Sequence, residues 1–215
     1  MMPREVAVFD LDGTLTTRDT SLPFLRAAAG RWALAKGLLW AGVCAPWDLV
    51  RVRGDEALPE KSTLGDVGGR WESLLHERVA SRTLAGMSLP AIESAARSFA
   101  DTIKRTFLRN DALGRIEEHR RAGHHLILAS ASLEVYLDPL CTSLGFDQVV
   151  GTRLEIRDGV ATGRFDGLPC WGMEKLRRVR VALDPARGDI LAHVYGNSRG
   201  DHPLLQAAQR ATYVE

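Results

Sequence analysis

The feature that most constrains the fold is a helix-rich stretch placed between one isolated strand and the rest of a sheet. Val6–Phe9 is a short apolar run rich in β-branched residues, which predicts a buried strand. Residues 21–104 are dominated by Ala, Leu, Arg and Glu, which predicts helices. Strand-like and helix-like segments then alternate. This order predicts an α/β fold: a Rossmann-like parallel sheet core flanked by helices, with an all-helical cap domain inserted after the first strand.

The second half supplies most of the expected core. Its expected strands are His125–Ser130, Gln148–Thr152, Ile190–Tyr195 and Ala211–Val214, and its expected helices are Ala112–Arg121, Leu133–Leu144, Met173–Leu183 and Pro203–Gln209. Asp158-Gly159 predicts a hairpin turn between Arg153–Ile156 and Val160–Arg164. We therefore expect a catalytic core of residues 1–16 and 105–215, and a helical cap domain of residues 17–104.

Charge and cysteine content exclude several classes of protein. The 215 residues carry 28 basic and 27 acidic side chains, so a global basic field for nucleic acid is absent. The three cysteines are far apart and form no CxxC pair, which argues against a zinc site and a disulfide framework. The N-terminal segment does not have the pattern of a secretion signal. We expect a cytoplasmic protein, and the sequence does not fix its oligomeric state.

Polar residues follow three of the predicted strands at their carboxyl ends. They are Asp10 and Asp12, Ser130 and Ser132, and Asn197 and Asp201. In open parallel sheets, ligands bind at this edge. The convergence predicts one functional site built from all three strand ends.

Asp10 and Asp12 carry the clearest chemistry. Two carboxylates so close repel each other unless a cation lies between them or one holds a proton. Oxygen ligands beside a phosphate suit Mg²⁺. Gly13 lets the chain turn sharply, and Thr14 offers a hydroxyl and a backbone donor to an anion. For this segment alone, a solvated acidic turn is an equally good interpretation.

Four segments together resemble the motifs of the haloacid dehalogenase-like superfamily, in the family's order. They are Phe9-Asp-Leu-Asp-Gly-Thr-Leu-Thr16, Ser130, Gly172-Met-Glu-Lys175 and Tyr195-Gly-Asn-Ser-Arg-Gly-Asp201. The resemblance covers Val6–Thr16 and roughly Leu108–Glu215. Within the family, the chain resembles the phosphoserine-phosphatase-like branch, through Ser130-Ala131-Ser132 and the segment that leads to Lys175. Residues of the cap match only loosely.

The resemblance implies a phosphoric monoester hydrolase with a defined set of roles. Asp10 would attack phosphorus, and Asp12 would act as general acid and base. Lys175 would neutralise charge, and Ser130 would hydrogen-bond a phosphoryl oxygen. Thr14, Ala131 and Ser132 are further expected substrate-binding residues. The implied cofactor is Mg²⁺, held by Asp10, Asp12, Asn197 and Asp201. Many relatives carry an acid at the position of Asn197, so we expect weaker metal binding here.

Single residues allow other readings. Ser130 could cap the next helix, Lys175 could be a solvated charge, and Asp201 could cap the helix near Pro203. Asp19 could contact substrate or cap the helix near Ser21. Arg78 could bind a substrate anion, although a surface charge is the more common role. His124 and His125 precede a strand without metal-ligand spacing, which indicates a structural role.

The substrate stays open between two classes. The branch implies a small phosphorylated metabolite such as phosphoserine or histidinol phosphate. The alternative is a lipid phosphate at a membrane surface, such as phosphatidylglycerophosphate or lysophosphatidate. It is suggested by residues 25–50, which mix Arg26, Arg31 and Lys36 with Leu38, Leu39, Trp40, Val43 and Trp47. Packing of these apolar side chains inside the cap is the favoured interpretation. A phosphomutase and a non-catalytic phosphate-binding relative are further alternatives, the latter suggested only by Asn197.

Overall fold

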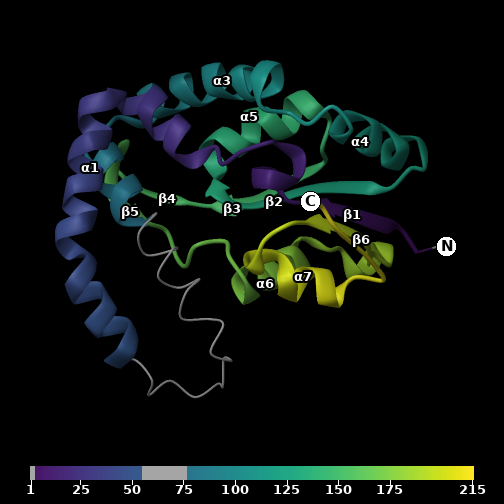
Figure 1. Ribbon diagram of the computed structural model, residues 1–215. Coiled ribbons are helices and arrows are strands. Elements are labelled where there is room, and N and C mark those ends of the chain that lie inside the picture. The colour runs from purple at the N-terminus through teal and green to yellow at the C-terminus, as the bar shows by residue number, and fades with distance from the viewer. Residues whose placement is uncertain (1–2, 55–76) are drawn as a thin grey trace.

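The centre of the molecule is a five-stranded parallel sheet. The computed structural model describes residues 3–54 and 77–215, without the side chains of residues 44–54. The strands are β1 (Glu5–Phe9), β2 (His125–Leu133), β3 (Gln148–Thr152), β6 (Ile190–Gly196) and β7 (Arg210–Tyr213). Their order is β3-β2-β1-β6-β7, so the first strand lies in the middle (Figure 1). The predicted parallel sheet is confirmed.

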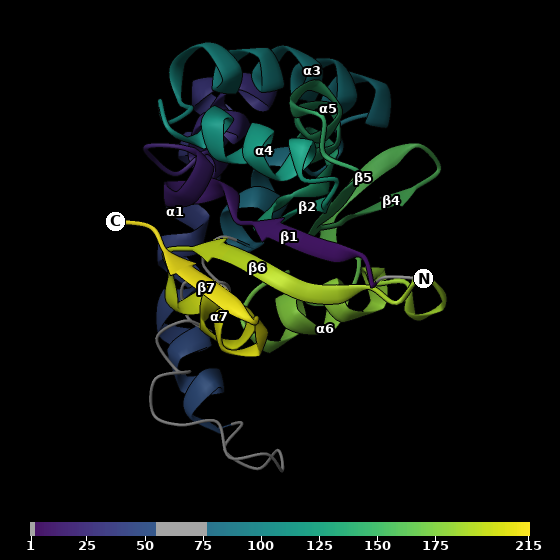
Figure 2. The same ribbon diagram turned by 90° about the vertical axis from the view of Figure 1, so that its right-hand side faces the viewer.

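Helices cover both faces of this sheet. The helices of the core are α4 (Ala112–Arg121), α5 (Glu134–Leu144), α6 (Met173–Ala182) and α7 (His202–Ala207). Single helical turns occur at Pro185–Arg187 and Arg199–Asp201, whereas Leu11–Leu15 forms a tight turn whose backbone is not helical at Asp12 and Gly13. Successive strand residues point to opposite faces. Ala7 and Phe9 therefore pack in the apolar cluster that includes α4 and α5, whereas Val6 and Val8 pack with α6 and α7. Figure 2 shows these two pairs of helices on opposite sides of the strands.

A helical region follows the first strand, as the sequence predicts. It contains α1 (Ser21–Gly54), a helical segment at residues 77–84, and α3 (Leu89–Thr106). The chain changes direction inside α1 at Gly30, whose φ of 83° and ψ of 167° interrupt the helix. Such a positive φ favours glycine. Residues 55–76 of the expected cap lie outside the described residues.

The apolar core runs from the sheet into this helical region without a break. Phe24 of α1 and Phe99 of α3 contact Tyr136 of α5, with ring centroids 4.6 and 5.5 Å from the tyrosine ring. All three side chains are buried. The expected cap therefore packs directly against the expected core. The division into residues 1–16 with 105–215 and residues 17–104 stays a proposal.

A β-hairpin leaves the sheet and meets the helical region. Its strands are β4 (Leu154–Arg157) and β5 (Val160–Phe165), as the Asp158-Gly159 turn predicts. The backbone N–H groups of Gly86 and Leu89 donate to the carbonyl oxygens of Ala161 and Gly159, at 2.9 and 2.8 Å. The hairpin thus fastens the start of α3 to the core.

Part of α1 presents apolar side chains to solvent. Trp32, Leu38, Leu39, Trp40 and Val43 are between 46% and 73% exposed. The favoured interpretation, that this segment packs inside the cap, is wrong for the last four of these side chains, and Trp47 lies outside the described side chains. None of the described helices combines the length and apolarity needed to cross a membrane.

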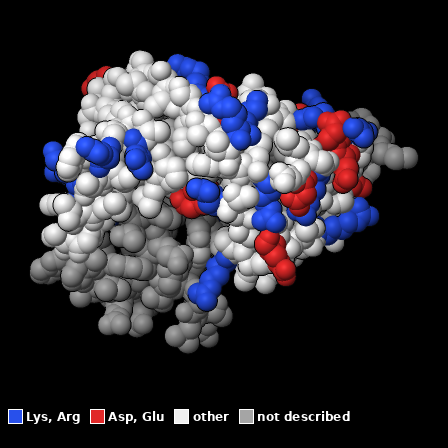
Figure 3. Space-filling view, turned by 45° about the horizontal axis from the view of Figure 1, so that its top comes forward, with Lys and Arg blue, Asp and Glu red and all other residues white. Residues whose placement is uncertain are grey.

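Charged side chains of both signs share the face seen in Figure 3. Over the right half of that view, Lys and Arg lie beside Asp and Glu. At the left, over α1, Lys and Arg lie beside uncharged surface. Charges of both signs are thus mixed over the right half of this face.

Candidate active site

The carboxyl ends of β1, β2 and β6 surround one cavity of about 350 Å³. Strand β1 lies between β2 and β6, and the helices that follow these two neighbours lie on opposite faces of the sheet. Such a reversal opens a crevice at the strand ends. Eight of the residues singled out from the sequence line it: Asp10, Asp12, Asp19, Ser130, Ala131, Ser132, Lys175 and Asn197.

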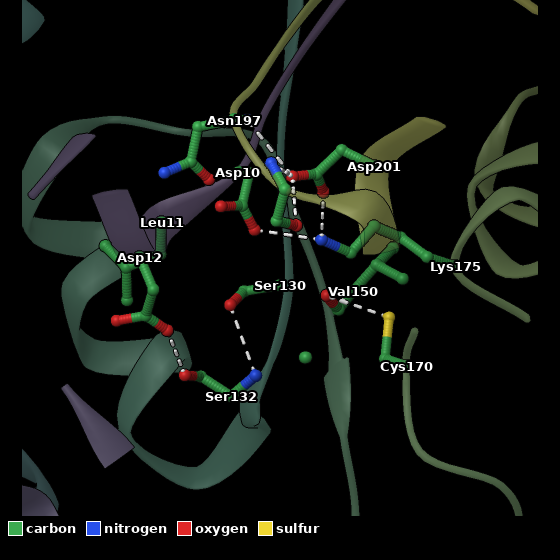
Figure 4. Close-up of polar contacts among 12 residues, drawn as sticks. Asp10, Leu11, Asp12, Ser130, Ser132, Val150, Cys170, Lys175, Asn197 and Asp201 are labelled. Atoms are coloured by element: carbon green, nitrogen blue, oxygen red, sulfur yellow. Dashed lines mark hydrogen bonds and ion pairs between the residues drawn. The ribbon is translucent and has the colours of Figure 1, made fainter. Parts of the chain in front are cut away.

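Lys175 stands between two carboxylates at the floor of this cavity. Its Nζ donates to Asp10 Oδ1 at 2.9 Å and to Asp201 Oδ1 at 2.6 Å (Figure 4). The lysine is only 2% exposed. Burial alone would lower the pKa of Lys175, but the attraction of Asp10 and Asp201 raises it above its ordinary value. The ammonium group therefore stays charged, and a solvated helix charge is excluded.

Asp201 turns both of its oxygens toward protein donors. Oδ1 accepts from Lys175, and Oδ2 accepts from the backbone N–H of Asn197 at 3.2 Å. Ser198 adds its backbone N–H at 3.0 Å and its hydroxyl at 2.7 Å. Asp201 is fully buried behind the residues that line the cavity. This arrangement favours a role in positioning Lys175 over the expected role as a direct metal ligand.

Asp12 is held by a second set of donors. Oδ1 accepts from the backbone N–H and the hydroxyl of Thr20, both at 2.7 Å, and Oδ2 accepts from the Ser132 hydroxyl at 2.5 Å. Burial, followed by the nearby charge of Asp19, raises the pKa of Asp12 to about 6, against the lowering effect of these hydrogen bonds. A carboxyl group with a pKa close to neutrality is suited to both giving and taking a proton.

Sequence reasoning missed two residues that support Asp12. Thr20 donates to Asp12, and its hydroxyl lies 2.9 Å from the hydroxyl of Tyr136, which is fully buried. Tyr136 lies on α5, more than a hundred residues away in the chain. Thr20 precedes the first residue of α1, where a hydroxyl usually signals a helix cap. Nothing in this local pattern points to the contact with Asp12.

Asn197 offers an oxygen that no described group satisfies. Its Oδ1 is buried and without a hydrogen-bond partner. Gly13, with a φ of 80°, lies against the same side chain, and a Cβ built on Gly13 would be 1.9 Å from Asn197 Nδ2. The chain therefore leaves room only for glycine at this position. A buried amide oxygen without a donor is a fitting ligand for a cation.

The charge balance around the cavity also fits a divalent cation. Asp10, Asp12, Asp19 and Asp201 outnumber Lys175 and, at the rim, Arg18. Burial raises the pKa of Asp10 to about 7, although Lys175 opposes the shift. An additional positive charge would relieve this excess of carboxylates. Asp10, the backbone carbonyl of Asp12 and Asn197 Oδ1 are the groups that would hold Mg²⁺.

Ser130 faces the cavity and does not cap a helix. Its hydroxyl oxygen accepts from the backbone N–H of Ser132 at 3.1 Å, and the residue preceding α5 is Leu133. Ser130 is 1% exposed and lines the cavity, as does Ala131. The capping alternative is therefore wrong, and Ser130 belongs to the cavity lining.

Three of the expected substrate contacts differ in their placement. Asp19 lines the cavity and also accepts from the backbone N–H of Ser21 at 2.9 Å, so both of its expected roles are compatible. Thr14 Oγ1 is buried without a partner and does not reach the cavity lining. Arg78 is half-buried, and Arg18 lines the cavity in its place. No sequence motif pointed to Arg18, whose guanidinium lies 5.1 Å from the Phe107 ring centroid.

Apolar side chains make the remaining walls. They come from α1, the 77–84 helix, the β2 end, β5 and the loop before α6: Leu22, Leu25, Val79, Ala80, Leu133, Phe165, Pro169 and Trp171. Polar groups are thus concentrated at the floor formed by the strand ends. A ligand would place its charged group there and a less polar part against these walls.

Comparison with known proteins places the chain in a family. The family model of the haloacid dehalogenase-like hydrolases matches residues 7–206. The chain belongs to this family. The resemblance read from the four motifs is therefore confirmed, and so is the expectation of a hydrolase.

Three relatives share part or most of the sequence. Protein CicA of Caulobacter vibrioides is 30% identical over 211 residues, which cover 97% of this chain and 85% of CicA. A histidinol-phosphatase of Neisseria meningitidis is 31% identical over 105 residues, or 46% of this chain and 47% of the relative. A phosphoserine phosphatase of Archaeoglobus fulgidus is 30% identical over 128 residues, or 59% of this chain and 34% of the relative.

Solved structures agree with the fold. A protein of unknown function from Bordetella pertussis Tohama I has a TM-score of 0.66 at 25% identity, covering 98% of this chain and 89% of that one. A phosphoserine phosphatase with an analogue of the phospho-aspartyl intermediate has a TM-score of 0.53 at 18% identity, covering 97% and 84%. This shared fold and the phosphoserine phosphatase among the relatives support the predicted phosphoserine-phosphatase-like branch.

Proposed function

We propose that this chain is a Mg²⁺-dependent phosphomonoesterase that hydrolyses a small phosphate ester through an aspartyl-phosphate on Asp10. The observation that carries the proposal is the joint placement of Asp10, Asp12, Lys175 and Ser130 around one cavity at the strand ends. Family membership and the phosphatases among the relatives support the same reaction. A binding protein without activity would not need the hydrogen bonds that hold Asp12.

The first half-reaction transfers the phosphoryl group to the enzyme. Asp10 Oδ2 attacks phosphorus, because its other oxygen is held by Lys175. The bond between phosphorus and the ester oxygen breaks, and protonated Asp12 gives its proton to the departing alkoxide. Lys175 and Ser130 would stabilise the negative charge that gathers on the phosphoryl oxygens.

The second half-reaction releases phosphate. Asp12, now ionised, takes a proton from water, and the water oxygen attacks phosphorus. The bond to Asp10 breaks, which restores both carboxyl groups. Bound Mg²⁺ would supply charge neutralisation for the phosphoryl oxygens. The pKa of Asp12, about 6, suits this exchange of roles.

The size and lining of the cavity support a small ester. A volume of about 350 Å³ lies at the lower end of the range of ligand pockets, about 300–1,000 Å³. Asp19 and Arg18 at the rim provide one negative and one positive group for an amino alcohol or a second anion. We therefore propose a small phosphorylated metabolite of the phosphoserine or histidinol phosphate type as the substrate.

The experiment is phosphate release from a panel of phosphomonoesters, with Mg²⁺ and with a chelator. Native protein should release phosphate only with Mg²⁺, and Asp10→Asn should not. Asp158→Asn is the matched control, because the same charge is removed from an exposed hairpin turn. No release from any ester by the native chain, or full activity of Asp10→Asn, would overturn the proposal.

A lipid phosphate is the second candidate, and the exposed apolar side chains of α1 favour it. Leu39 and Val43 are 73% and 67% exposed, and Arg82 stacks on Trp40 at 5.3 Å. Basic and apolar groups side by side suit an anionic membrane surface. Co-sedimentation with anionic vesicles at low salt tests this. The candidate requires binding that Leu39→Ser with Val43→Ser removes and that Val181→Ser on α6 retains.

A further inference from the structure

A group of three histidines lies beneath α4, outside the cavity described above. His119 is in the last turn of α4, His124 precedes β2, and His193 is on β6. One ring nitrogen from each lies within 4.8 Å of the others. Figure 2 shows α4 over β1 and β6, which brings these distant parts of the chain together. Glu5, the first residue of β1, adds a carboxylate to the group.

The Glu5 carboxylate lies at ligand-to-ligand spacing from two of these histidines. Glu5 Oε2 lies 3.1 Å from His193 Nε2 and 3.4 Å from His124 Nε2. In a tetrahedral zinc site the metal–ligand bonds are about 2.0–2.2 Å, so neighbouring ligand atoms are about 3.4 Å apart. Two imidazoles and one carboxylate are ligands that suit Zn²⁺ and related transition metals better than Mg²⁺.

His119 is placed to orient one of these ligands. Its Nδ1 lies 2.7 Å from His124 Nδ1, and its Nε2 lies 2.9 Å from the Tyr195 hydroxyl. When His124 Nδ1–H donates to His119, the His124 Nε2 lone pair is free and directed toward Glu5. Metal-bound histidines regularly donate their other ring N–H to such a partner.

The group is also open enough for a metal to enter. The His124, His193 and Glu5 side chains are 18%, 14% and 37% exposed, whereas His119 is buried. Arg210 Nη1 lies 3.3 Å from His193 Nε2. Because Arg210 is exposed, its guanidinium can move into solvent and free that nitrogen.

We propose that Glu5, His124 and His193 form a second metal site, for Zn²⁺ or a similar transition-metal ion, with His119 as the outer partner of His124. The site would join β1, β6 and the turn before β2 at a place that the catalytic chemistry does not use. Water would complete the shell. The argument from the cysteines against a zinc site does not apply, since the ligands are histidines and a glutamate.

The test is zinc binding to the whole chain after removal of metals, with excess Mg²⁺ present and in the Asp10→Asn background. Both conditions suppress zinc binding at the active site. One equivalent should bind and raise the thermal midpoint. His124→Gln and Glu5→Gln should each lose this binding, and His119→Gln should weaken it by about 10–100-fold. His202→Gln, an exposed histidine on α7, is the matched control and should bind as the parent does.

Visible absorption of bound Co²⁺ distinguishes metal binding by these residues from a purely structural role for them. Co²⁺ in a tetrahedral shell with nitrogen ligands absorbs strongly in the visible region, and Glu5→Gln should abolish this absorption while the far-UV circular dichroism stays unchanged. Absence of zinc binding by the parent protein would overturn the proposal. If His124→Gln and Glu5→Gln bound zinc as tightly as the parent protein, the proposal would be overturned as well, since the metal would then lie elsewhere.

Discussion

The floor and the walls of the cavity are built in different ways. At the floor, hydrogen bonds fix two of the charged side chains: two carboxylates hold Lys175, and Thr20 and Ser132 hold Asp12. The walls are apolar side chains from the helical region, the β2 end, β5 and the loop before α6, with few directional contacts. A fixed polar floor suits one reaction, whereas apolar walls can change shape and substrate with little effect on that reaction.

The largest expected effect comes from breaking the floor at Lys175. Lys175→Met removes the partner of Asp10 and Asp201 and leaves two buried carboxylates without it. We expect kcat to fall by about 10²–10³-fold and the free energy of unfolding to fall by about 3–5 kcal/mol. Steady-state kinetics and urea unfolding measure the two losses. Lys104→Met, at an exposed position of α3, should change neither.

The next effect concerns metal binding at the floor. Asn197→Asp would replace the unpaired amide oxygen with a charged one beside Asp10. We expect the Mg²⁺ concentration for half-maximal activity to fall by about tenfold, or ~1.4 kcal/mol. A titration of activity with Mg²⁺ measures this. An unchanged requirement would count against Asn197 as a ligand.

Changes in the walls should act on substrate choice and not on chemistry. Phe165→Leu with Leu22→Ser reshapes the apolar side of the cavity. A missing methylene contact is worth about 1–3 kcal/mol. We therefore expect the ratio of kcat/KM between a large and a small ester to change by about tenfold. The kcat for a small chromogenic ester should stay close to native. Leu113→Ser, on the exposed surface of α4, is the control. A loss of kcat equal to that of Lys175→Met would erase the distinction between floor and walls.

The smallest expected effect lies beside the floor, in α6. Hydrogen bonds from Arg177 and then Arg178 outweigh partial burial and lower the pKa of Glu174 to about 2. Arg178 also donates to the carbonyl of Gly151 at 2.6 Å, which links α6 to β3. Because the pKa is lowered in the folded state, the stabilisation is present above pH 4.5 and is lost as the pH falls toward 2.

Unfolding measured between pH 2 and 6 tests this sign. Glu174→Gln should flatten the dependence of stability on pH in that range and should lower stability at pH 6 more than at pH 2. Glu118→Gln, an exposed glutamate of α4, is the charge-matched control. If the stability of Glu174→Gln depended on pH as that of the native protein does, Glu174 and its two arginines would not be the source of the pH-dependent stabilisation.

Much of the floor could be predicted from the sequence because its polar residues lie at or near strand ends. Asp10 and Asn197 directly follow β1 and β6, and Ser130 lies near the end of β2. Parallel strands bring their carboxyl ends to one edge. Lys175 lies on α6 and was expected only from the family resemblance. The alternation of apolar segments likewise gave the sheet and its flanking helices. Thr20 and Tyr136 were not predictable, since their contact joins residues 116 positions apart without a motif.

The helical region and the histidine group show the limit of local patterns. Apolar residues in a helix predict a buried face, yet Leu39 and Val43 are exposed, because burial depends on which neighbour packs there. His124 carried no metal-ligand spacing because its partners, Glu5 and His193, are supplied by other strands. Sheet order, and not sequence spacing, brings them together.

The hairpin has a consequence for how substrate reaches the cavity. A lid opens freely only when few contacts hold it to the core, whereas this helical region packs on α5 through Phe24 and Phe99 and is also held by the hairpin. Besides its covalent connections to the core, it is bonded through Gly86 and Leu89 to the hairpin. An opening movement must therefore break these bonds or carry the hairpin and Phe165 with it. The hairpin therefore both holds the helical region in place and supplies Phe165 to the cavity wall. A mutation that loosens the hairpin should alter substrate entry and substrate fit together.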